Sequence, residues 1–187
     1  DVAANALNLR ALDPEVPAPF RDVYDAERYR KAQQYAQART RFGLLTTTID
    51  LTLLLAFWLA GGFHWLDGAV RAQGLGPIPS GLVFIGSLAL AQTLLAIPRR
   101  WWSTFVIEER FGFNRTTPRT FCIDLAKGLA LAALLGGPLL AAILWLLASA
   151  GPQAWLWCWV VSAVFLMGVQ LVVPTWIMPL FNRFSPL

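Results

Sequence analysis

Two adjacent glutamates, Glu108 and Glu109, are the residues with the clearest potential for acid–base chemistry in this sequence. They lie in a charged island, Ser103–Thr120, that separates two long apolar runs and reads STFVIEERFGFNRTTPRT. The island also carries three arginines, three phenylalanines and Asn114. Two carboxylic acids can serve as general acid and base where their surroundings separate their pKa values. Adjacent acids on a basic segment are more typical of ion-pair partners, which is the interpretation we prefer.

Metal binding and nucleophilic catalysis need groups that this sequence does not bring together. A zinc site requires several Cys, His or carboxylate ligands at close quarters, and the sequence has one histidine and two cysteines. His64 falls beside Trp65 at the outer end of an apolar run. Cys122 and Cys158 fall at opposite ends of two different runs, about a membrane thickness apart. We therefore predict no disulfide, zinc site or Cys–His pair within this chain.

The composition is that of a membrane protein. Apolar residues make up 57% of the sequence, only 14% are charged and the mean hydropathy is +0.54, whereas soluble domains carry about 25% charged residues. A bilayer span needs about 20 apolar residues, and lipid offers no partner for unpaired backbone groups. We therefore predict an all-α fold, a polytopic membrane helix bundle with four spans. The predicted spans are residues 44–66, 80–98, 123–149 and 154–180.

The region before the first span has a different character. The letters ANALNLRAL are compatible with the end of a preceding helix, and residues 13–20 contain three prolines, which is typical of a linker. Residues 22–41 are rich in Ala, Gln, Arg and Tyr, and we predict an interfacial helix there with Tyr35 at headgroup level. The predicted organisation is thus residues 1–43 before the membrane, then a transmembrane domain over residues 44–187 with a loop at 99–121.

The distribution of basic residues predicts the orientation. Arginine and lysine gather before the first span and between the second and third, while the connection at 67–79 has Arg71 alone and that at 150–153 has none. Because cytoplasmic segments carry the excess of positive charge, we expect the island and both chain ends to face the cytoplasm. The net charge of +4 is then an orientation signal, and no nucleic-acid partner is expected.

Three charges fall within the predicted spans. Asp124 and Lys127 are three residues apart on one helix, so they can pair with each other or with partners in the island. Asp50 lies about 9 Å into the first span and could meet Arg110, Arg115 or Lys127. The centres of the spans are apolar, and for this reason a proton or ion pathway is poorly supported.

Prolines and glycines predict where the third and fourth helices begin and bend. Thr117 followed by Pro118 is typical of an N-cap and a first-turn proline, so the third helix should begin there. Residues 136–138, with the sequence GGP, and Pro174 should each kink a helix or open its hydrogen-bond ladder.

Four strings in this sequence resemble the N-terminal membrane region of the CAAX prenyl protease type I family. They are TFVIEERFGFNRTT in the island, FCIDLAKG after it, KAQQYAQARTRFG before the first span, and VPTWIMPLFNRFSPL at residues 173–187. The most specific are the T-F-V-[IL]-E-E-x-x-G-F-N pattern at Thr104–Asn114 and the P-L-F-[ND]-x-F-x-P-L pattern at Pro179–Leu187. The resemblance runs from about Leu7 to Leu187 and keeps the order of the family's elements.

The resemblance implies an integral-membrane zinc metallopeptidase with about seven helices around an intramembrane chamber, four of which, the second to fifth, would be the spans found here. In the family, zinc is held by an H-E-x-x-H helix and a later glutamate, and the motif glutamate activates water. This sequence contains no such motif. The expected function is therefore that of the membrane domain, with zinc and the catalytic residues in a part of the protein outside this chain.

A supporting role beneath the active site is what the resemblance implies for the polar residues of this chain. The residues expected to have this role are Glu108, Glu109, Arg110, Asn114, Asp124 and Lys127. The expected partners are the lipid bilayer, the catalytic portion of the same protein and a peptide or lipidated peptide substrate. A stand-alone membrane scaffold or small carrier, with the island as a docking loop, is the alternative.

The ratio of arginine to lysine indicates the kind of organism from which the sequence comes. Thirteen arginines against two lysines favour a high-GC bacterial gene. We therefore expect a prokaryotic homologue in the bacterial cytoplasmic membrane, or a protein of the endoplasmic reticulum if the source is eukaryotic.

Overall fold

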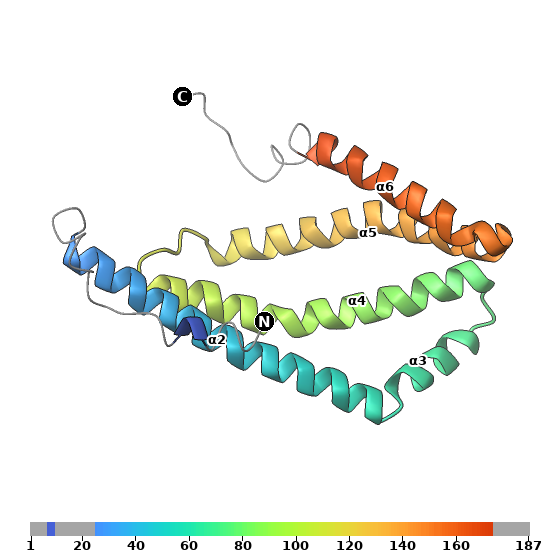
Figure 1. Ribbon diagram of the computed structural model, residues 1–187. Coiled ribbons are helices and arrows are strands. Elements are labelled where there is room, and N and C mark those ends of the chain that lie inside the picture. Colours follow the sequence, from blue (N-terminus) through green and yellow to red (C-terminus); the bar gives the residue numbers. More distant parts are fainter. Residues whose placement is uncertain (1–6, 10–24, 174–187) are drawn as a thin grey trace. The chain divides into compact units, whose positions relative to one another are not determined.

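The computed structural model describes residues 7–9 and 25–173, and all regular structure in this part of the chain is helical. This confirms the predicted all-α class. Contacts divide the chain into two units, one made of residues 1–68 and 88–116 and the other of residues 69–87 and 117–187. The longer elements, shown in Figure 1, are α2 (Ala26–Leu59), α3 (Gly62–Arg71), α4 (Pro77–Trp102), α5 (Pro118–Ser149) and α6 (Ala154–Val172).

Four helical stretches in the described residues are long and apolar enough to cross a membrane, as predicted. They are Ala26–Leu59, Pro77–Glu108, Pro118–Ser149 and Gly151–Val172. Large apolar side chains point outward along them, among them Leu94, Leu134 and Trp159, which are 55%, 70% and 68% exposed. Such exposed surfaces suit a lipid surround, because a bilayer removes the cost of leaving apolar side chains outside the protein core.

Helix α2 joins two segments that were predicted separately. The side chain of Asp25 caps its first turn by accepting bonds from the backbone N–H groups of Glu27 and Arg28. The helix then runs unbroken for 34 residues to Leu59, which is about 51 Å at 1.5 Å per residue and longer than a bilayer core. The predicted interfacial helix and the first span are therefore one element.

The first span ends earlier than predicted. We placed its end at residue 66, but α2 stops at Leu59 and the chain turns at Gly61, whose φ of +75° is readily adopted only by glycine. The short helix α3 follows, with Val70 buried and Trp65 70% exposed. The ring of Phe57 in α2 lies 5.0 Å from that of Phe63 in α3, edge to face, so the two helices pack at the bend.

The predicted loop at 99–121 is largely helical. Helix α4 continues past Pro98 to Trp102 and then widens into a π-helix, η2 (Ser103–Glu108). Helical structure continues to Arg110, and only residues 111–117 lie outside helices before α5 begins. We predicted a loop because this segment is charged. Charged residues are also compatible with a helix that extends beyond the apolar layer of the membrane.

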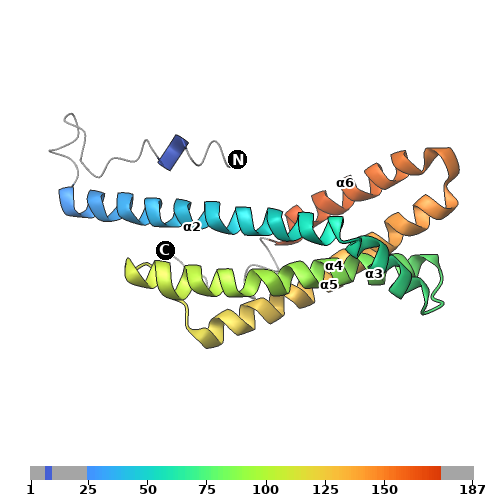
Figure 2. The same cartoon turned by 90° about the horizontal axis from the view of Figure 1, so that it is seen from below.

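Helices α5 and α6 form an antiparallel pair joined by the short 3₁₀ turn η3 (Gly151–Gln153), and both views show them side by side at that end (Figures 1 and 2). Thr117 caps α5, with its Oγ1 accepting from the N–H of Thr120 at 3.2 Å, and Pro118 occupies the first turn, as predicted. Pro138 lies inside α5 without ending it. The fourth span was predicted to reach residue 180, and its part after residue 173, including Pro174, lies outside the described residues.

Candidate functional site in the charged island

The turn after the π-helix is held by a backbone motif that terminates helices. The N–H of Gly112 donates to the carbonyl of Glu109 at 3.0 Å, and the N–H of Phe113 donates to the carbonyl of Glu108 at 2.9 Å. Gly112 has φ +71°, so the arrangement is a Schellman motif with glycine in the left-handed position. The N–H of Asn114 also approaches the carbonyl of Glu108, at 3.3 Å. Glu108 and Glu109 therefore contribute to this turn through their backbone carbonyls.

Asn114 links the end of the helix to the start of the next segment. Its Nδ2 donates to Oε2 of Glu109 at 2.9 Å, while its Oδ1 accepts from the backbone N–H of Thr116 at 2.7 Å. One side chain therefore uses both its donor and its acceptor to bridge the segment from Glu109 to Thr116. Because Glu109 accepts a hydrogen bond here, its carboxylate is engaged as a structural acceptor in this turn.

Tyr35 of α2 packs against the two phenylalanines of the turn. Its ring centroid lies 5.5 Å from that of Phe111 and 4.8 Å from that of Phe113, at interplanar angles of 67° and 56°. Phe111 is buried, with 9% of its surface exposed, whereas Phe113 is 51% exposed. The contact with Phe111 is edge to face, which is favourable because the positive ring edge meets the negative face, and the contact with Phe113 is tilted. The ring of Tyr35 thus takes part in protein packing, and its expected position at headgroup level stays a prediction.

Two cations lie beside these rings. The guanidinium carbon of Arg110 is 5.9 Å from the ring centroid of Phe111, and Nζ of Lys31 is 5.9 Å from that of Phe113. Both distances fall within the range of cation–π attraction. Arg110 therefore stabilises the island by its contact with the ring of Phe111. Lys31 adds a second connection between α2 and the turn, through the ring of Phe113.

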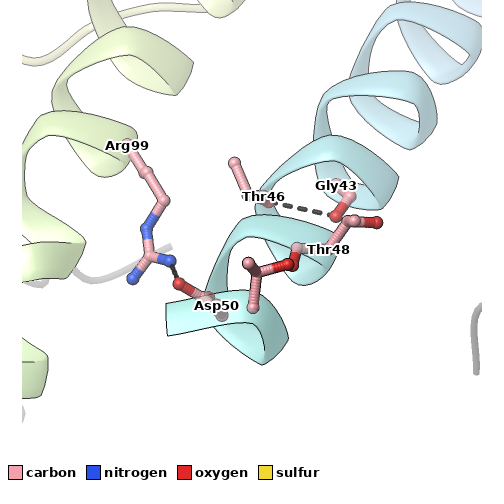
Figure 3. Close-up of polar contacts among 6 residues, drawn as sticks. Gly43, Thr46, Thr48, Asp50 and Arg99 are labelled. Carbon is pink, nitrogen blue, oxygen red and sulfur yellow. Dashed lines mark hydrogen bonds and ion pairs between the residues drawn. The ribbon is translucent and has the colours of Figure 1, made fainter. Parts of the chain in front are cut away.

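Asp50 pairs with Arg99, and this corrects the partners that we predicted. A side-chain oxygen of Asp50 contacts Nη1 of Arg99, which lies just after Pro98 in α4 (Figure 3). Arg99 is separated from Arg110 by eleven residues, about 16 Å along a helix, so the two arginines are at different levels. The side chain of Arg99 is 22% exposed and that of Asp50 is 49% exposed.

Asp124 and Lys127, the other two residues expected to support a site, are exposed on the first turns of α5. They belong to a different unit from the turn described above, and their pairing stays a prediction. In the described residues, no three His, Cys, Asp or Glu side chains gather as metal ligands would. Cys122 and Cys158 are free thiols, and the thiol of Cys158 donates to the carbonyl of Ile143 at 3.8 Å.

We missed three contributors to this arrangement, and the sequence contained usable signals for two of them, Gly112 and Arg99. Gly112 stands directly after a charged helical segment, where a helix-ending glycine is common. Tyr35 lies in a helix whose spacing was evident, but the aromatic partners come from a segment about 75 residues later, and spacing cannot reveal them. Arg99 was counted only as an orientation signal, although an acid within a span requires a nearby cation.

The fold and the island together define a polytopic helical membrane protein whose candidate site is a structurally fixed polar turn at one end of two spans. The model for the CAAX prenyl protease N-terminal family, described as having five membrane helices, matches residues 5–183. The chain belongs to this family. Four candidate spans lie in the described residues, and their assignment as the second to fifth helices stays a prediction.

The similarity of the chain to individual proteins supports this family assignment. The chain is 32% identical to the probable CAAX prenyl protease 1 of Schizosaccharomyces pombe over 91% of its length, and 31% identical to the CAAX prenyl protease 1 of Saccharomyces cerevisiae over 94%. A crystal structure of Ste24p from S. mikatae matches the whole chain with a TM-score of 0.87 and 26% identity. The chain spans 39% and 41% of the two yeast relatives and 46% of the crystallised chain.

Proposed function

We propose that this chain is the membrane domain of an integral-membrane zinc metalloendopeptidase that cleaves membrane-associated or prenylated-type substrates. The observation that carries the proposal is the similarity to proteins named CAAX prenyl protease 1, which extends over nearly the whole chain. Because the chain is shorter than these relatives, the peptidase activity is assigned to the complete gene product.

Zinc, in this proposal, is bound by a part of the protein outside this sequence. The donor set available here does not fit a zinc site, because the sequence has one histidine and the described residues hold no cluster of ligands. A catalytic zinc ion supplies an activated water at neutral pH. The residues of this chain contribute support, orientation and a surface toward the bilayer.

The island is the part of this chain that would support the catalytic portion. Glu109 and Asn114 join the helix end to the turn, Glu108 receives the backbone bonds, and Arg110 lies against the ring of Phe111. A turn with this many independent restraints has little freedom to move, and catalytic groups gain from rigid supporting contacts. Asp124 and Lys127 would extend the same support from the beginning of α5.

The proposed placement follows from the charges. The island and both chain ends would face the cytoplasm, and the spans would contact lipid, in a bacterial cytoplasmic membrane or in the endoplasmic reticulum of a eukaryote. The remaining partners would be the catalytic portion of the same protein and a peptide or lipidated peptide.

The function is tested with the full-length gene product purified in detergent. We expect about one zinc per chain by metal analysis, cleavage of a farnesylated CAAX peptide or of a membrane-associated peptide, and loss of cleavage with a chelator followed by recovery on zinc addition. A folded, zinc-free protein that cleaves neither peptide would contradict the proposal.

The supporting role of the island is tested separately with Glu109→Gln in the same protein. We expect lower peptidase activity or a lower Tm, because the hydrogen bond from Asn114 loses its charged acceptor. Glu27→Gln is the matched control, since Glu27 is an exposed glutamate in the first turn of α2. Wild-type activity and Tm in Glu109→Gln would remove Glu109 from the proposed support.

A further inference from the structure

The segment that runs from α4 into the island contacts α2 at two places. Arg99 of α4 pairs with Asp50 (Figure 3), and twelve residues after Arg99 the ring of Phe111 packs against that of Tyr35. Asp50 and Tyr35 are fifteen residues apart in α2, which is an unbroken α-helix. At about 100° per residue they are rotated by only about 60° from each other. Both contacts therefore use one side of α2.

An ordinary α-helix would turn Arg99 and Phe111 to different sides. Twelve residues at about 100° each leave Phe111 about 120° away from Arg99. The π-helix η2 lies between the two residues, at Ser103–Glu108. Because π-helical hydrogen bonds join residues i and i+5, the stretch accommodates one extra residue and sets the following residues back by about 100°. The difference that remains is about 20°, which returns Phe111 to the side of Arg99.

The exposure of the side chains agrees with this rotation. Ile107 and Phe111, at successive four-residue steps after Arg99, are both 9% exposed, and Arg99 itself is mostly covered. In a second row with the same step, Trp102 and Val106 are 53% and 40% exposed. An α-helix drifts by about 40° at each four-residue step, so a covered row that keeps this spacing indicates the wider π-helical turn. The covered row faces α2, against which η2 packs.

We propose that η2 sets the rotation of the island relative to the part of α4 before it, so that one helix can hold Arg99 on Asp50 and Phe111 on Tyr35 at the same time. The extra residue of the π-helix is the means. The same rotation fixes the directions of Glu109 and therefore of the hydrogen bond that it accepts. The inference rests on the two contacts and on the exposure of the side chains, and it holds whether or not the complete protein is a peptidase.

This proposal predicts an asymmetry between removing and adding a residue in η2. Deletion of Val106 leaves eleven residues from Arg99 to Phe111, which an ordinary α-helix rotates to within about 20° of each other. Both contacts with α2 can then persist without the π-helix. Insertion of one alanine after Val106 instead turns the island by about 100° relative to Arg99.

Deletion of Thr47 in α2 is the matched control. Thr47 is exposed and lies between Tyr35 and Asp50. Helix α2 is α-helical throughout its 34 residues, so it has no π-helical turn that could absorb the change. Removing one residue there rotates Asp50 by about 100° relative to Tyr35.

Cross-linking of α2 to the island in the full-length gene product, purified in detergent, provides the measurement. Cys122 and Cys158 are replaced by serine, and Lys31→Cys and Phe113→Cys are introduced as the reporter pair. Nζ of Lys31 lies 5.9 Å from the ring centroid of Phe113, and neither residue belongs to the two contacts under test. The probe is a short bifunctional maleimide, and the parent is the protein with the reporter pair and no deletion or insertion.

We expect deletion of Val106 to keep cross-linking within about twofold of the parent, because the shortened segment preserves the rotation. The alanine insertion and the deletion of Thr47 should each lower cross-linking about tenfold, because they do not preserve it. A variant that fails to fold counts as a loss of cross-linking. Equal cross-linking after the two deletions, or after the deletion and the insertion in η2, would overturn the proposal.

Discussion

The amide of Asn114 donates to the carboxylate of Glu109 across 2.9 Å, and this bond joins the last helical turn of the island to the residues that leave it. The same asparagine accepts from the N–H of Thr116. Side chains thus repeat the connection that the backbone makes through Gly112 and Phe113.

Exchanging the donor and the acceptor of this hydrogen bond tests how much the bond contributes to the stability of the protein. Asn114→Asp places two carboxylates in contact, and we expect it to lower the free energy of unfolding by about 1–2 kcal/mol, at the lower end because the pair is exposed. The double variant Glu109→Gln/Asn114→Asp should recover most of the loss, because Gln can donate to Asp and Asp still accepts from Thr116. Thermal unfolding in detergent provides the measurement. A double variant no more stable than Asn114→Asp alone would show that the bond contributes nothing.

Gly112 tests the backbone of the turn. Alanine at φ +71° costs about 1–2 kcal/mol, so Gly112→Ala should lower the Tm. The nearest atom to the added Cβ would be Nζ of Lys31 at 3.6 Å, an ordinary contact, which leaves backbone conformation as the cause. Gly128→Ala is the control, since Gly128 is inside α5 with open space around it and alanine there favours the helix by up to about 1 kcal/mol. The same Tm change in both variants would contradict this explanation.

Tyr35 tests the packing between α2 and the island. We expect Tyr35→Ala to destabilise the protein by about 2–3 kcal/mol, less than for a fully buried ring, because it removes the contacts with Phe111 and Phe113. Tyr35→Phe keeps the ring and should stay within about 0.5 kcal/mol of the wild type. Chemical or thermal unfolding of the two variants provides the comparison. If Tyr35→Phe were as unstable as Tyr35→Ala, the hydroxyl and not the ring would be responsible.

The stability of the first turn of α2 is expected to depend on pH through the carboxyl group of Asp25. Backbone hydrogen bonds from Arg28 and Glu27 lower the pKa of this carboxyl, because they favour its charged form. A lowered pKa in the folded state means that the cap stabilises the helix above the usual aspartate pKa, and that this contribution is lost as the pH falls through the folded value.

Hydrogen exchange of the first turn of α2, corrected for the intrinsic rate, measures this effect. Protection in the wild type should decrease below about pH 4. Asp25→Asn should keep a constant protection over the same range, because asparagine caps helices without titrating. Parallel pH profiles for the two proteins would argue against Asp25 as the titrating group.

The general fold could be predicted from the sequence because lipid imposes strong rules on composition. A run of about 20 apolar residues must become a helix when no water is present to pair its backbone. Four helical stretches long and apolar enough to cross a membrane are found among the described residues, at the places of the predicted spans. Local signals were also sufficient at Thr117 and Pro118, where the cap involves residues close in sequence. Charge was a weaker guide, because it does not distinguish a loop from a helix that continues into water, as at Ser103–Glu108.

The contacts of the candidate site were decided by the tertiary structure. Glu109 and Asn114 could be named in advance because they stand in one short polar segment, but the ring partners of Tyr35 and the choice of Arg99 for Asp50 depend on how α2 lies against α4 and the island. The sequence by itself determined that the chain is helical, membrane-spanning and interrupted by one charged turn. Only the packing of distant segments decided which side chains meet, because contact energies depend on positions that sequence spacing does not specify.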